Sequence, residues 1–387
     1  MTTNQKRIFI LKNPKMGTQE LATHLGLSTR QVREHKAKIK AEKLTVKQLE
    51  AEEVNQEVGA DRTIRKLQEG KSATEKKNKA LLDQIEVLED EKEAILEIKS
   101  NIKPFVIKPS KGKGSESAAL WVASDWHVAE HVTFGQTNGI NEYNLSISKA
   151  RGERFFRNGL KLTDMSAKET RIKTIVLALL GDFITGHLHA QAVETNLLAP
   201  VHEIQHAQNI IISGIQYILD NSKYDLVIPC HSGNHGRTTK FSEFGSENGH
   251  SWEYFMYCNI ASYFRGEKRV QVHIAEGAHS YHDVLGTRIR FLHGHDVKYG
   301  GGVGGITIPL NKAIAQWDIA NKADLTVCGH FHQRTDTGRA LVNGSLIGYN
   351  SFALSIKASA EKPQQTFALI DSKEGKTIVA PILVDKE

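Results

Sequence analysis

Short apolar runs, each followed by a polar side chain, recur along the C-terminal two-thirds of the chain. They occupy residues 118–124, 175–180, 226–229 and 325–328. A strand with one solvated face alternates apolar and polar residues, whereas a strand buried on both faces reads as an unbroken apolar run. The segments between these runs that have helical character are residues 201–220, 252–265 and 311–320. We therefore predict an α/β layered domain over residues 118–387, with a sheet covered on both faces.

Residues 1–45 predict a small helical unit. Leu21, Ala22 and Leu25 share one face of a helix, and Gly26 permits a sharp turn after it. Ser28, with Gln31 three residues later, has the pattern of a capping box at the start of a second helix. Two helices joined in this way resemble a helix-turn-helix.

The second helix of this unit carries basic residues that we expect to contact DNA: Arg30, Arg33, Lys36 and Lys40. Up to Lys47 the chain has eleven lysines and arginines against three acidic residues. A local positive charge of this kind suits a phosphate backbone, and arginine can read guanine in a major groove. The alternative is a helical hairpin used only for packing, with its lysines solvated.

Residues 46–103 predict one long, exposed helix. The segment has no proline and is rich in Glu, Lys, Ala, Leu and Gln. Apolar residues fall on a seven-residue grid, the repeat of a coiled coil, at Leu67, Leu81, Leu88, Ile95 and Ile102. We expect a homodimer through residues 67–102. A hairpin that folds on itself or on the following domain is the alternative.

Composition limits the class of protein. Pro104, Pro109 and the Lys-Gly-Lys-Gly-Ser string predict a flexible linker over residues 104–117. No apolar run reaches the ~18 residues of a membrane span, so we expect no contact with a membrane. Three cysteines lie far apart in apolar surroundings, which favours free thiols in a reducing cytoplasm.

Five short strings with metal-binding side chains follow one another in the C-terminal part. They are Asp125-Trp126-His127, Gly181-Asp182, Gly233-Asn234-His235, His293-Gly294-His295 and Gly329-His330-Phe331-His332. Carboxylate and amide oxygens together with imidazole nitrogens suit a pair of divalent cations that share one carboxylate. One such string would be weak evidence for a metal site, but five in this order are strong evidence for one.

The ordered set resembles the calcineurin-like metallophosphoesterase superfamily, with similarity to its repair-exonuclease branch. The resemblance covers about residues 118–387 and implies a two-sheet sandwich flanked by helices. It implies that Asp125, His127 and His332 hold one metal, that Asn234, His293 and His330 hold the other, and that Asp182 bridges the two. His295 stays open as an alternative to His293.

The resemblance also implies a chemistry for the site. His235 would stabilise the transition state or protonate the leaving oxygen, and a metal-bound hydroxide would be the nucleophile. We expect manganese at both metal positions, and iron or zinc would also suit the ligands. Arg237 and Lys240 are candidate phosphate contacts. Gly186-His187-Leu188-His189 repeats the fifth string too early in the chain, so His187 or His189 is only a candidate for lining the substrate cleft.

The leading hypothesis is a dinuclear-metal phosphodiesterase that acts as a DNA nuclease. Protein phosphatases of this superfamily carry G-D-x-x-D-R-G and G-N-H-E, whereas here the strings are Gly-Asp-Phe-Ile-Thr-Gly and Gly-Asn-His-Gly-Arg. The missing arginine and glutamate argue against a serine/threonine phosphatase. The alternatives are a phosphatase or phosphodiesterase on a small or protein phosphoester, and a DNA-binding regulator with a vestigial catalytic domain.

Overall fold

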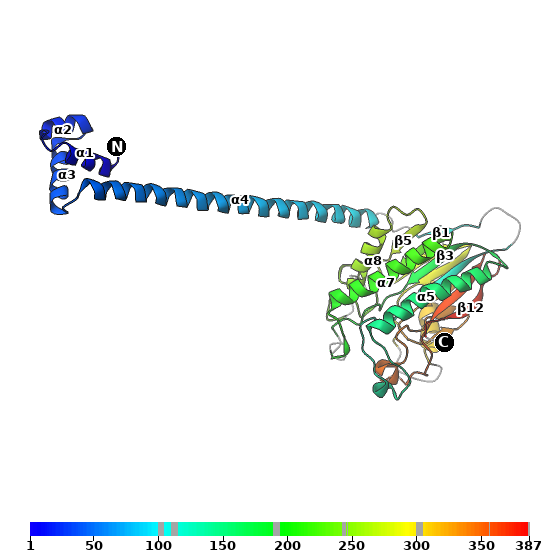
Figure 1. Ribbon diagram of the computed structural model, residues 1–387. Helices are drawn as coiled ribbons and strands as arrows, with labels where there is room; N and C mark the ends of the chain where they lie inside the picture. The colour runs from blue at the N-terminus through cyan, green and yellow to red at the C-terminus, as the bar shows by residue number, and fades with distance from the viewer. Residues whose placement is uncertain are drawn as a thin grey trace. The chain divides into compact units, whose positions relative to one another are not determined.

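The structure, a computed structural model, describes residues 1–99, 104–109, 115–188, 194–241, 245, 247–298, 305–355 and 357–385. Within residues 83–99 it describes the helical backbone and not the side chains. The chain forms two compact units, Met1–Glu91 and Lys92–Glu387 (Figure 1).

Three short helices begin the first unit: α1 (Thr3–Lys12), α2 (Thr18–Leu25) and α3 (Thr29–Ala41). Their common core contains Ile10, Leu21, Ala22, Leu25 and Val32. Gly26 adopts φ 66° after α2, a left-handed conformation that glycine reaches without a steric penalty. The backbone N–H of Gln31 donates to Ser28 Oγ at 3.2 Å, and that of Ser28 donates to Gln31 Oε1 at 2.9 Å. The two helices, the turn and the capping box predicted from the sequence are therefore present.

A single helix, α4 (Val46–Lys99), follows. It is continuous, so the alternative of a hairpin that folds on itself does not hold over this range. Leu67 and Leu81 of the seven-residue grid are 68% and 50% exposed. The side chains of Leu88 and Ile95, and all of Ile102, lie outside what the structure describes. Pairing of two chains along α4 stays a prediction.

The second unit contains two mixed β-sheets of six strands each. The first has the order β12 (Gly375–Leu383), β11 (Gln364–Asp371), β2 (Glu116–Ala123), β3 (Arg171–Leu179), β4 (Asp225–Cys230), β5 (Val270–Ile274). The second has the order β1 (Val106–Ile107), β6 (Ser280–Val284), β7 (Thr287–Phe291), β8 (Leu325–Cys328), β10 (Ala340–Val342), β9 (Thr335–Asp336). Strands β2 to β5 run parallel to one another, and so do β7, β8 and β10.

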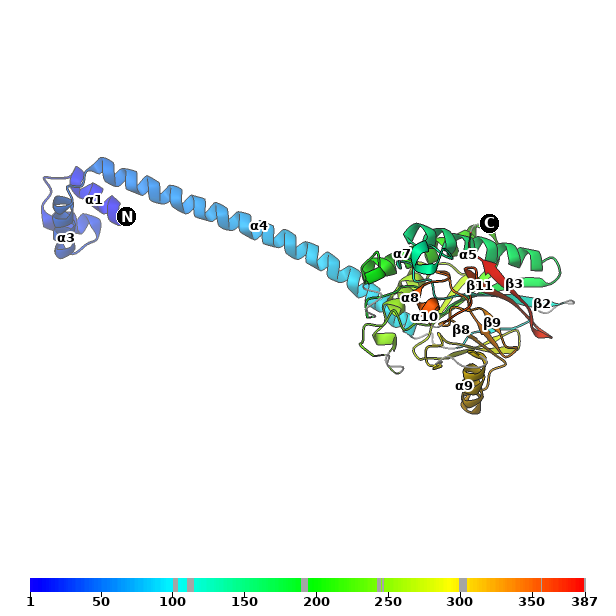
Figure 2. The same ribbon diagram turned by 90° about the horizontal axis from the view of Figure 1, so that it is seen from below.

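Helices cover the outer faces of both sheets (Figures 1 and 2). The helices α5 (Leu145–Ser166), α7 (Pro200–Asn221) and α8 (Trp252–Tyr263) pack on the first sheet, and α9 (Thr307–Ala320) packs on the second. Short helices η1 (Phe134–Thr137), η2 (Glu247–Gly249) and α10 (Ser351–Ser355) lie in the connections.

Strand β2 shows why its sequence is apolar throughout. Trp121 belongs to the core beneath the helices, whereas Leu120 belongs to the core between the two sheets. Both faces of the strand are therefore buried, which is the origin of the unbroken apolar run. The predicted fold class, a two-sheet sandwich flanked by helices, is confirmed. Among the described residues, no helix combines the length and the apolar character needed to cross a membrane.

The segment expected to be a flexible linker is in part a strand. Val106 and Ile107 form β1, which pairs in parallel with β6. Phe105 is buried, its ring stacks on His282 at 4.0 Å between centroids, and its N–H donates to His282 Nδ1. The prolines directed the prediction toward a linker, but the apolar triplet between them finds a sheet edge and a core. Residues 110–114 lie outside the described residues.

Candidate metal centre

All five predicted strings follow strands whose carboxyl ends lie at one side of the sandwich. Asp125 follows β2, Asp182 follows β3, Asn234 follows β4, His293 follows β7 and His330 follows β8. The first three strands are parallel within one sheet, and the last two are parallel within the other. Parallel neighbours end at the same edge, and ligands of layered α/β folds bind there.

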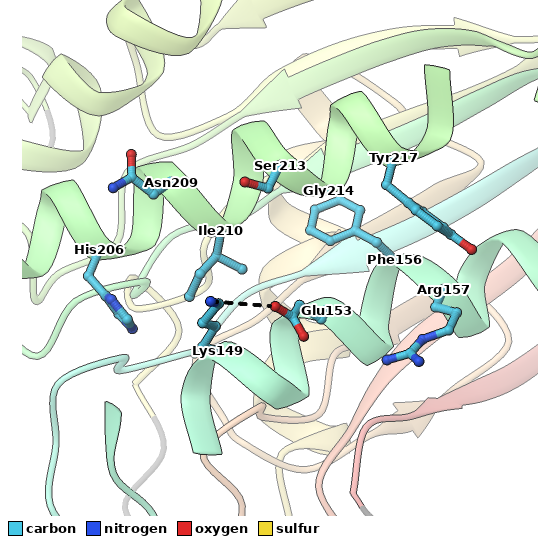
Figure 3. A pocket seen from close by; sticks show the side chains of 10 residues that line it. All are labelled: Lys149, Glu153, Phe156, Arg157, His206, Asn209, Ile210, Ser213, Gly214 and Tyr217. Atoms are coloured by element: carbon cyan, nitrogen blue, oxygen red, sulfur yellow. Dashed lines mark ion pairs between the residues drawn. The ribbon is translucent and has the colours of Figure 1, made fainter. Parts of the chain in front are cut away.

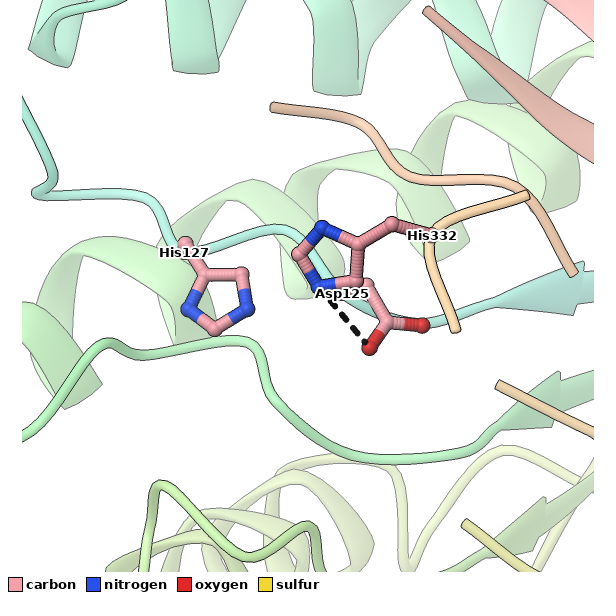
Figure 4. A group of neighbouring side chains, drawn as sticks. All are labelled: Asp125, His127 and His332. Carbon is pink, nitrogen blue, oxygen red and sulfur yellow. Dashed lines mark ion pairs between the residues drawn. The ribbon is translucent and has the colours of Figure 1, made fainter. Parts of the chain in front are cut away.

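The structure brings these side chains into three overlapping groups of potential metal ligands. In each group the ligand atoms lie within 4.8 Å of one another. The groups are Asp125–His127–His332 (Figure 4), His127–Asp182–His235 and Asp182–His293–His330. Asp182 belongs to two of these groups, one with His127 and one with His293 and His330. Its carboxylate therefore lies between the two predicted ligand sets, where a bridging carboxylate would have to be.

His293 contacts both Asp182 and Asn234, the neighbouring predicted ligands. His293 Nε2 lies 2.9 Å from Asp182 Oδ2 and 3.2 Å from Asn234 Oδ1. The other ring nitrogen, Nδ1, donates to the carbonyl of Leu180 at 2.6 Å. That bond fixes the tautomer, because a carbonyl only accepts, and it leaves Nε2 as the nitrogen that faces the cluster.

Buried ring nitrogens without a hydrogen-bond partner indicate that this set of side chains suits divalent cations. Both ring nitrogens of His127 and Nδ1 of His332 are buried and have no hydrogen-bond partner among the described residues. Buried polar atoms are almost always satisfied, so unsatisfied ones need an explanation. A cation beside Asp125 and His127 would provide it for one ring nitrogen of His127.

Burial and mutual charge shift the pKa values of the clustered side chains away from their usual ranges. Burial, with a further contribution from the charge of Asp182, raises the pKa of Asp125 to about 7. Burial alone would raise the pKa of Asp182, but the charges of His293 and His235 overcome it and hold that pKa well below its usual range. Burial opposes the charge of His293, but the nearby Asp182 raises its pKa to about 10. Metal ions must displace such protons, so metal affinity should rise with pH.

Five predicted ligands have left-handed backbone conformations: Asp125 (φ 57°), His127 (φ 44°), Asp182 (φ 55°), His330 (φ 72°) and His332 (φ 56°). Such conformations are uncommon outside glycine and cost of order 1–3 kcal/mol each. Residues of this kind concentrate at binding and catalytic sites, where the surrounding structure holds them in place.

Two hydrogen bonds hold His235 beside the cluster. Its backbone N–H donates to Asp182 Oδ1 at 2.8 Å, and its Nδ1 donates to the carbonyl of Thr185 at 2.8 Å. Nδ1 therefore carries a proton, and Nε2 lies on the far side of the ring. The rings of His235 and His127 lie 4.7 Å apart.

A cavity of about 340 Å³ opens over the cluster. Besides the predicted residues, its walls contain Glu130, Thr185, Thr195, Asn350, Ser351 and Phe352. The buried carboxylate of Glu130 accepts a hydrogen bond from Asn350 Nδ2 at 3.0 Å, and Phe352 contacts the ring of His332. Sequence reasoning missed these residues, because they lie outside the five strings.

The predicted substrate contacts make other interactions in the structure. None of His187, Arg237 and Lys240 is among the described residues that line the cavity. Arg237 Nη1 donates to the carbonyl of Asn234, and Lys240 lies over the ring of Phe241. His187 is exposed, and His189 lies outside the described residues. His295, the alternative to His293, contacts Glu247 Oε1 at 2.9 Å.

Two further buried carboxylates support the loops that carry the ligands. Glu203 of α7 accepts the N–H of Thr185 at 2.8 Å, and Glu253 of α8 accepts the N–H of Phe183 at 2.6 Å. A signal for both exists in the sequence. Glu203 falls on the buried face of α7 with Ala207 and Ile210, and Glu253 precedes buried Tyr257 by one helical turn. An acidic residue on an apolar helix face is uncommon enough to indicate a buried role.

A separate hollow of about 590 Å³ lies between α5 and α7 (Figure 3). Figure 3 shows Lys149 and Glu153 of α5 on one side of it and His206 of α7 on the other. None of the predicted ligands lines it, and we assign it no part in the chemistry.

Comparisons with known proteins find solved structures of low similarity. No protein-family model matches the chain, and no curated protein matches it. A hypothetical protein from Pyrococcus horikoshii is 13% identical over 70% of this chain and 89% of its own, with a TM-score of 0.34. A dimetal phosphatase from Danio rerio is 11% identical over 70% of this chain and 100% of its own, with a TM-score of 0.30. A hypothetical protein from Thermus thermophilus is 10% identical over 68% of this chain and 97% of its own, with a TM-score of 0.23. At TM-scores this low, the likenesses say nothing of the chemistry of this chain.

Fold and site together define a class: a two-sheet α/β protein with a buried cluster of histidines and carboxylates at its strand ends.

Proposed function

We propose that residues 118–387 form a dinuclear-metal phosphodiesterase, and that DNA is its substrate. The observation that carries the proposal is the position of Asp182, which shares ligand groups with His127 on one side and with His293 and His330 on the other. A single carboxylate between two ligand sets suits a pair of closely spaced cations, because it can offer one oxygen to each.

Two divalent cations, when bound, would supply a nucleophile near neutral pH and stabilise the charge that develops on the phosphoryl oxygens. Asp125, His127 and His332 would hold one cation, and Asn234, His293 and His330 the other. His235 belongs to the group with His127 and Asp182 and lines the cavity. Its Nδ1 donates to the carbonyl of Thr185, which holds the ring in place. We assign it protonation of the leaving oxygen: as an imidazolium it would give up its Nε2 proton to that oxygen and keep the Nδ1 proton on the Thr185 carbonyl.

The walls of the cavity favour a diester over a monoester. None of the described residues that line it is a lysine or an arginine. A phosphomonoester carries close to two negative charges near neutral pH, whereas each diester carries one. A site without a fixed cationic side chain is therefore better suited to the diester.

DNA enters the proposal through the N-terminal unit. On α3, Arg30, Arg33 and Lys40 are exposed and Lys36 is half-buried, so all four basic residues reach the surface of a compact three-helix unit. Side chains of this kind at a helix surface can neutralise phosphates and reach base edges.

The test combines a substrate panel with a change at Asp182. Purified full-length protein with manganese should cleave linear or single-stranded DNA and bis-4-nitrophenyl phosphate, and EDTA should abolish both activities. Asp182→Ala should lower turnover by more than about a hundredfold, because even residues behind metal ligands cost 10–100-fold when removed.

Asp220→Ala is the matched control, since Asp220 is an exposed aspartate of α7 whose carboxylate accepts a hydrogen bond from Gln216 Nε2 on the same helix. We expect it to retain full activity. Activity confined to phosphomonoesters would reject the diesterase proposal, and full turnover by Asp182→Ala would reject the bridging role.

A further inference from the structure

The two loops that carry Asp182 and Asn234 touch through their backbones. A Cβ atom on Gly181 would lie 2.3 Å from the backbone nitrogen of Gly233, and one on Gly233 would lie 2.4 Å from that of Asp182. Neither position has room for a side chain. The distance between the bridging carboxylate and the second ligand set is therefore set by direct packing of one loop on the other.

One buried carboxylate, that of Glu253, accepts hydrogen bonds from both loops. Its Oε2 accepts the N–H of Gly233 at 2.7 Å and that of Asp182 at 3.2 Å, and its Oε1 accepts the N–H of Phe183 at 2.6 Å. The side chain is completely buried. An ionised carboxylate has only acceptor sites, which suits it to collect several N–H donors at one point.

Local structure explains how Glu253 reaches this place. Arg237, which follows the Asn234 loop, forms a β-bridge with Ser251, and the N–H of Trp252 donates to the carbonyl of Gly236 at 2.8 Å. Ser251 caps α8 by accepting the N–H of Glu253. The first turn of the helix is therefore fastened beside the loop, and a carboxylate is favoured at that end of a helix.

Gly236 lies against the side chain of Glu253. A Cβ atom there would lie 2.7 Å from Cγ and 3.2 Å from Oε2 of Glu253. The backbone of Gly236 is not in the left-handed region. Its lack of a side chain is thus explained by the space that Glu253 occupies, and not by the backbone conformation.

We propose that Glu253 is a positioning residue of the metal centre: its carboxylate fixes the Asp182 loop against the Asn234 loop, from the space that a side chain at position 236 would otherwise fill. The inference rests on the metal pair proposed above and adds the residue that sets its spacing. In this role Glu253 touches neither substrate nor metal. It acts through the backbone of Asp182 and Gly233.

The first experiment replaces the carboxylate by an amide of the same shape in the full-length protein. Glu253→Gln places an NH2 group against backbone N–H donors, so at least one loop loses its acceptor. Manganese binding, measured by titration calorimetry and by the electron paramagnetic resonance of free Mn²⁺, should weaken by about 10–100-fold. Unchanged manganese affinity in a folded Glu253→Gln protein would overturn the proposal.

Glu116→Gln is the matched control. Glu116 is also a buried carboxylate, but it pairs with Arg171 at 2.8 Å at the start of β2, the end of the strand away from Asp125. We expect this variant to unfold at a lower temperature and to bind manganese as the parent does. An equal loss of affinity in both variants would show a general effect of stability and would contradict the role of Glu253.

A second experiment removes the carboxylate at position 253 and introduces one at the neighbouring position 236. Glu253→Ala should lose affinity for manganese, and Gly236→Glu in the Glu253→Ala background should recover at least about tenfold of it. Gly236→Glu alone should bind manganese poorly, because two side chains would compete for one space. If the double variant binds no more tightly than Glu253→Ala, the carboxylate in this space is not what positions the loops.

The two proposals fail in different ways. Parent protein that binds no manganese would remove the metal centre itself. Parent protein that binds manganese with the same affinity as Glu253→Gln would leave the metal centre in place and remove only the inference about Glu253.

Discussion

At the scale of single residues, the ligands combine chemical suitability with an uncommon backbone. Asp125 has φ 57°, and the N–H of His330 donates to both of its carboxylate oxygens, at 3.1 and 3.0 Å. Ser124 Oγ donates to the same carboxylate and accepts from Asn343 Nδ2 at 2.9 Å. The position of Asp125 is therefore determined by several bonds that oppose the backbone strain.

His235 provides the sharpest prediction at this scale. If its Nε2 protonates the leaving oxygen, His235→Ala should lower kcat by about 10²–10⁴-fold for an alkyl phosphodiester. The loss should be much smaller for bis-4-nitrophenyl phosphate, whose leaving group needs no proton. Manganese affinity should change little.

The control for this prediction is His202→Ala, which removes an exposed histidine of α7. The opposite result is informative, because His235 also lies within ligand distance of His127 and Asp182. A large loss of manganese affinity in His235→Ala would make His235 a metal ligand and would refute its assignment as the acid.

At the scale of secondary-structure elements, β1 is fastened to β6 through a neutral histidine. His282 Nδ1 accepts the N–H of Phe105 at 3.2 Å, which is possible only when this nitrogen carries no proton. Burial, with a smaller contribution from His273, lowers the pKa of His282 to about 3. The unfolded chain has the usual histidine pKa near 6.5, so below that pH the unfolded state takes up a proton that the folded state does not bind.

The stability of the second unit should therefore fall as the pH is lowered from about 6.5 toward 3. His282 alone should contribute about 2 kcal/mol of lost stability by pH 5. Thermal unfolding followed between pH 8 and pH 5 measures this loss, with His282→Asn as the comparison, because its amide oxygen can accept the same N–H without titrating. Parallel pH profiles for the two proteins would contradict the anchoring role of neutral His282.

At the scale of the whole molecule, the chain joins a basic helical unit to a candidate hydrolase. If α3 binds the phosphate backbone, replacing Arg30, Arg33, Lys36 and Lys40 by alanine should weaken DNA binding across all sequences. The slope of log affinity against log salt should become shallower by about one for each lysine or arginine that no longer neutralises a phosphate. Fluorescence anisotropy with a labelled duplex at several salt concentrations measures both effects.

Lys71→Ala is the control, because Lys71 is 78% exposed on α4 and lies 3.9 Å from Glu75. It should leave the salt slope unchanged. The fourfold variant should keep its activity on bis-4-nitrophenyl phosphate, since that substrate has no backbone for α3 to hold. An unaltered salt slope in the fourfold variant would exclude α3 as the DNA-binding element.

The residues that could bind metal, and the kind of element on which they lie, were predictable from local sequence patterns. An apolar run that ends in Asp125 or Asp182 indicates a buried strand with a carboxylate at its end, and the ligand types follow from the letters. The capping box at Ser28 was equally predictable, because its two bonds join residues three positions apart. Local patterns of this kind do not depend on the rest of the molecule.

Which distant residues these side chains contact became clear only from the folded chain. Glu253 reaches the Asp182 loop across 71 positions of sequence, and Phe105 reaches His282 across 177. Gly236 has no room for a side chain because Glu253 of α8 occupies the neighbouring space. Contacts between residues so far apart depend on how strands pair and helices pack. No periodicity along the chain records them, because the spacing of residues in sequence carries no information on which distant segment will be the neighbour.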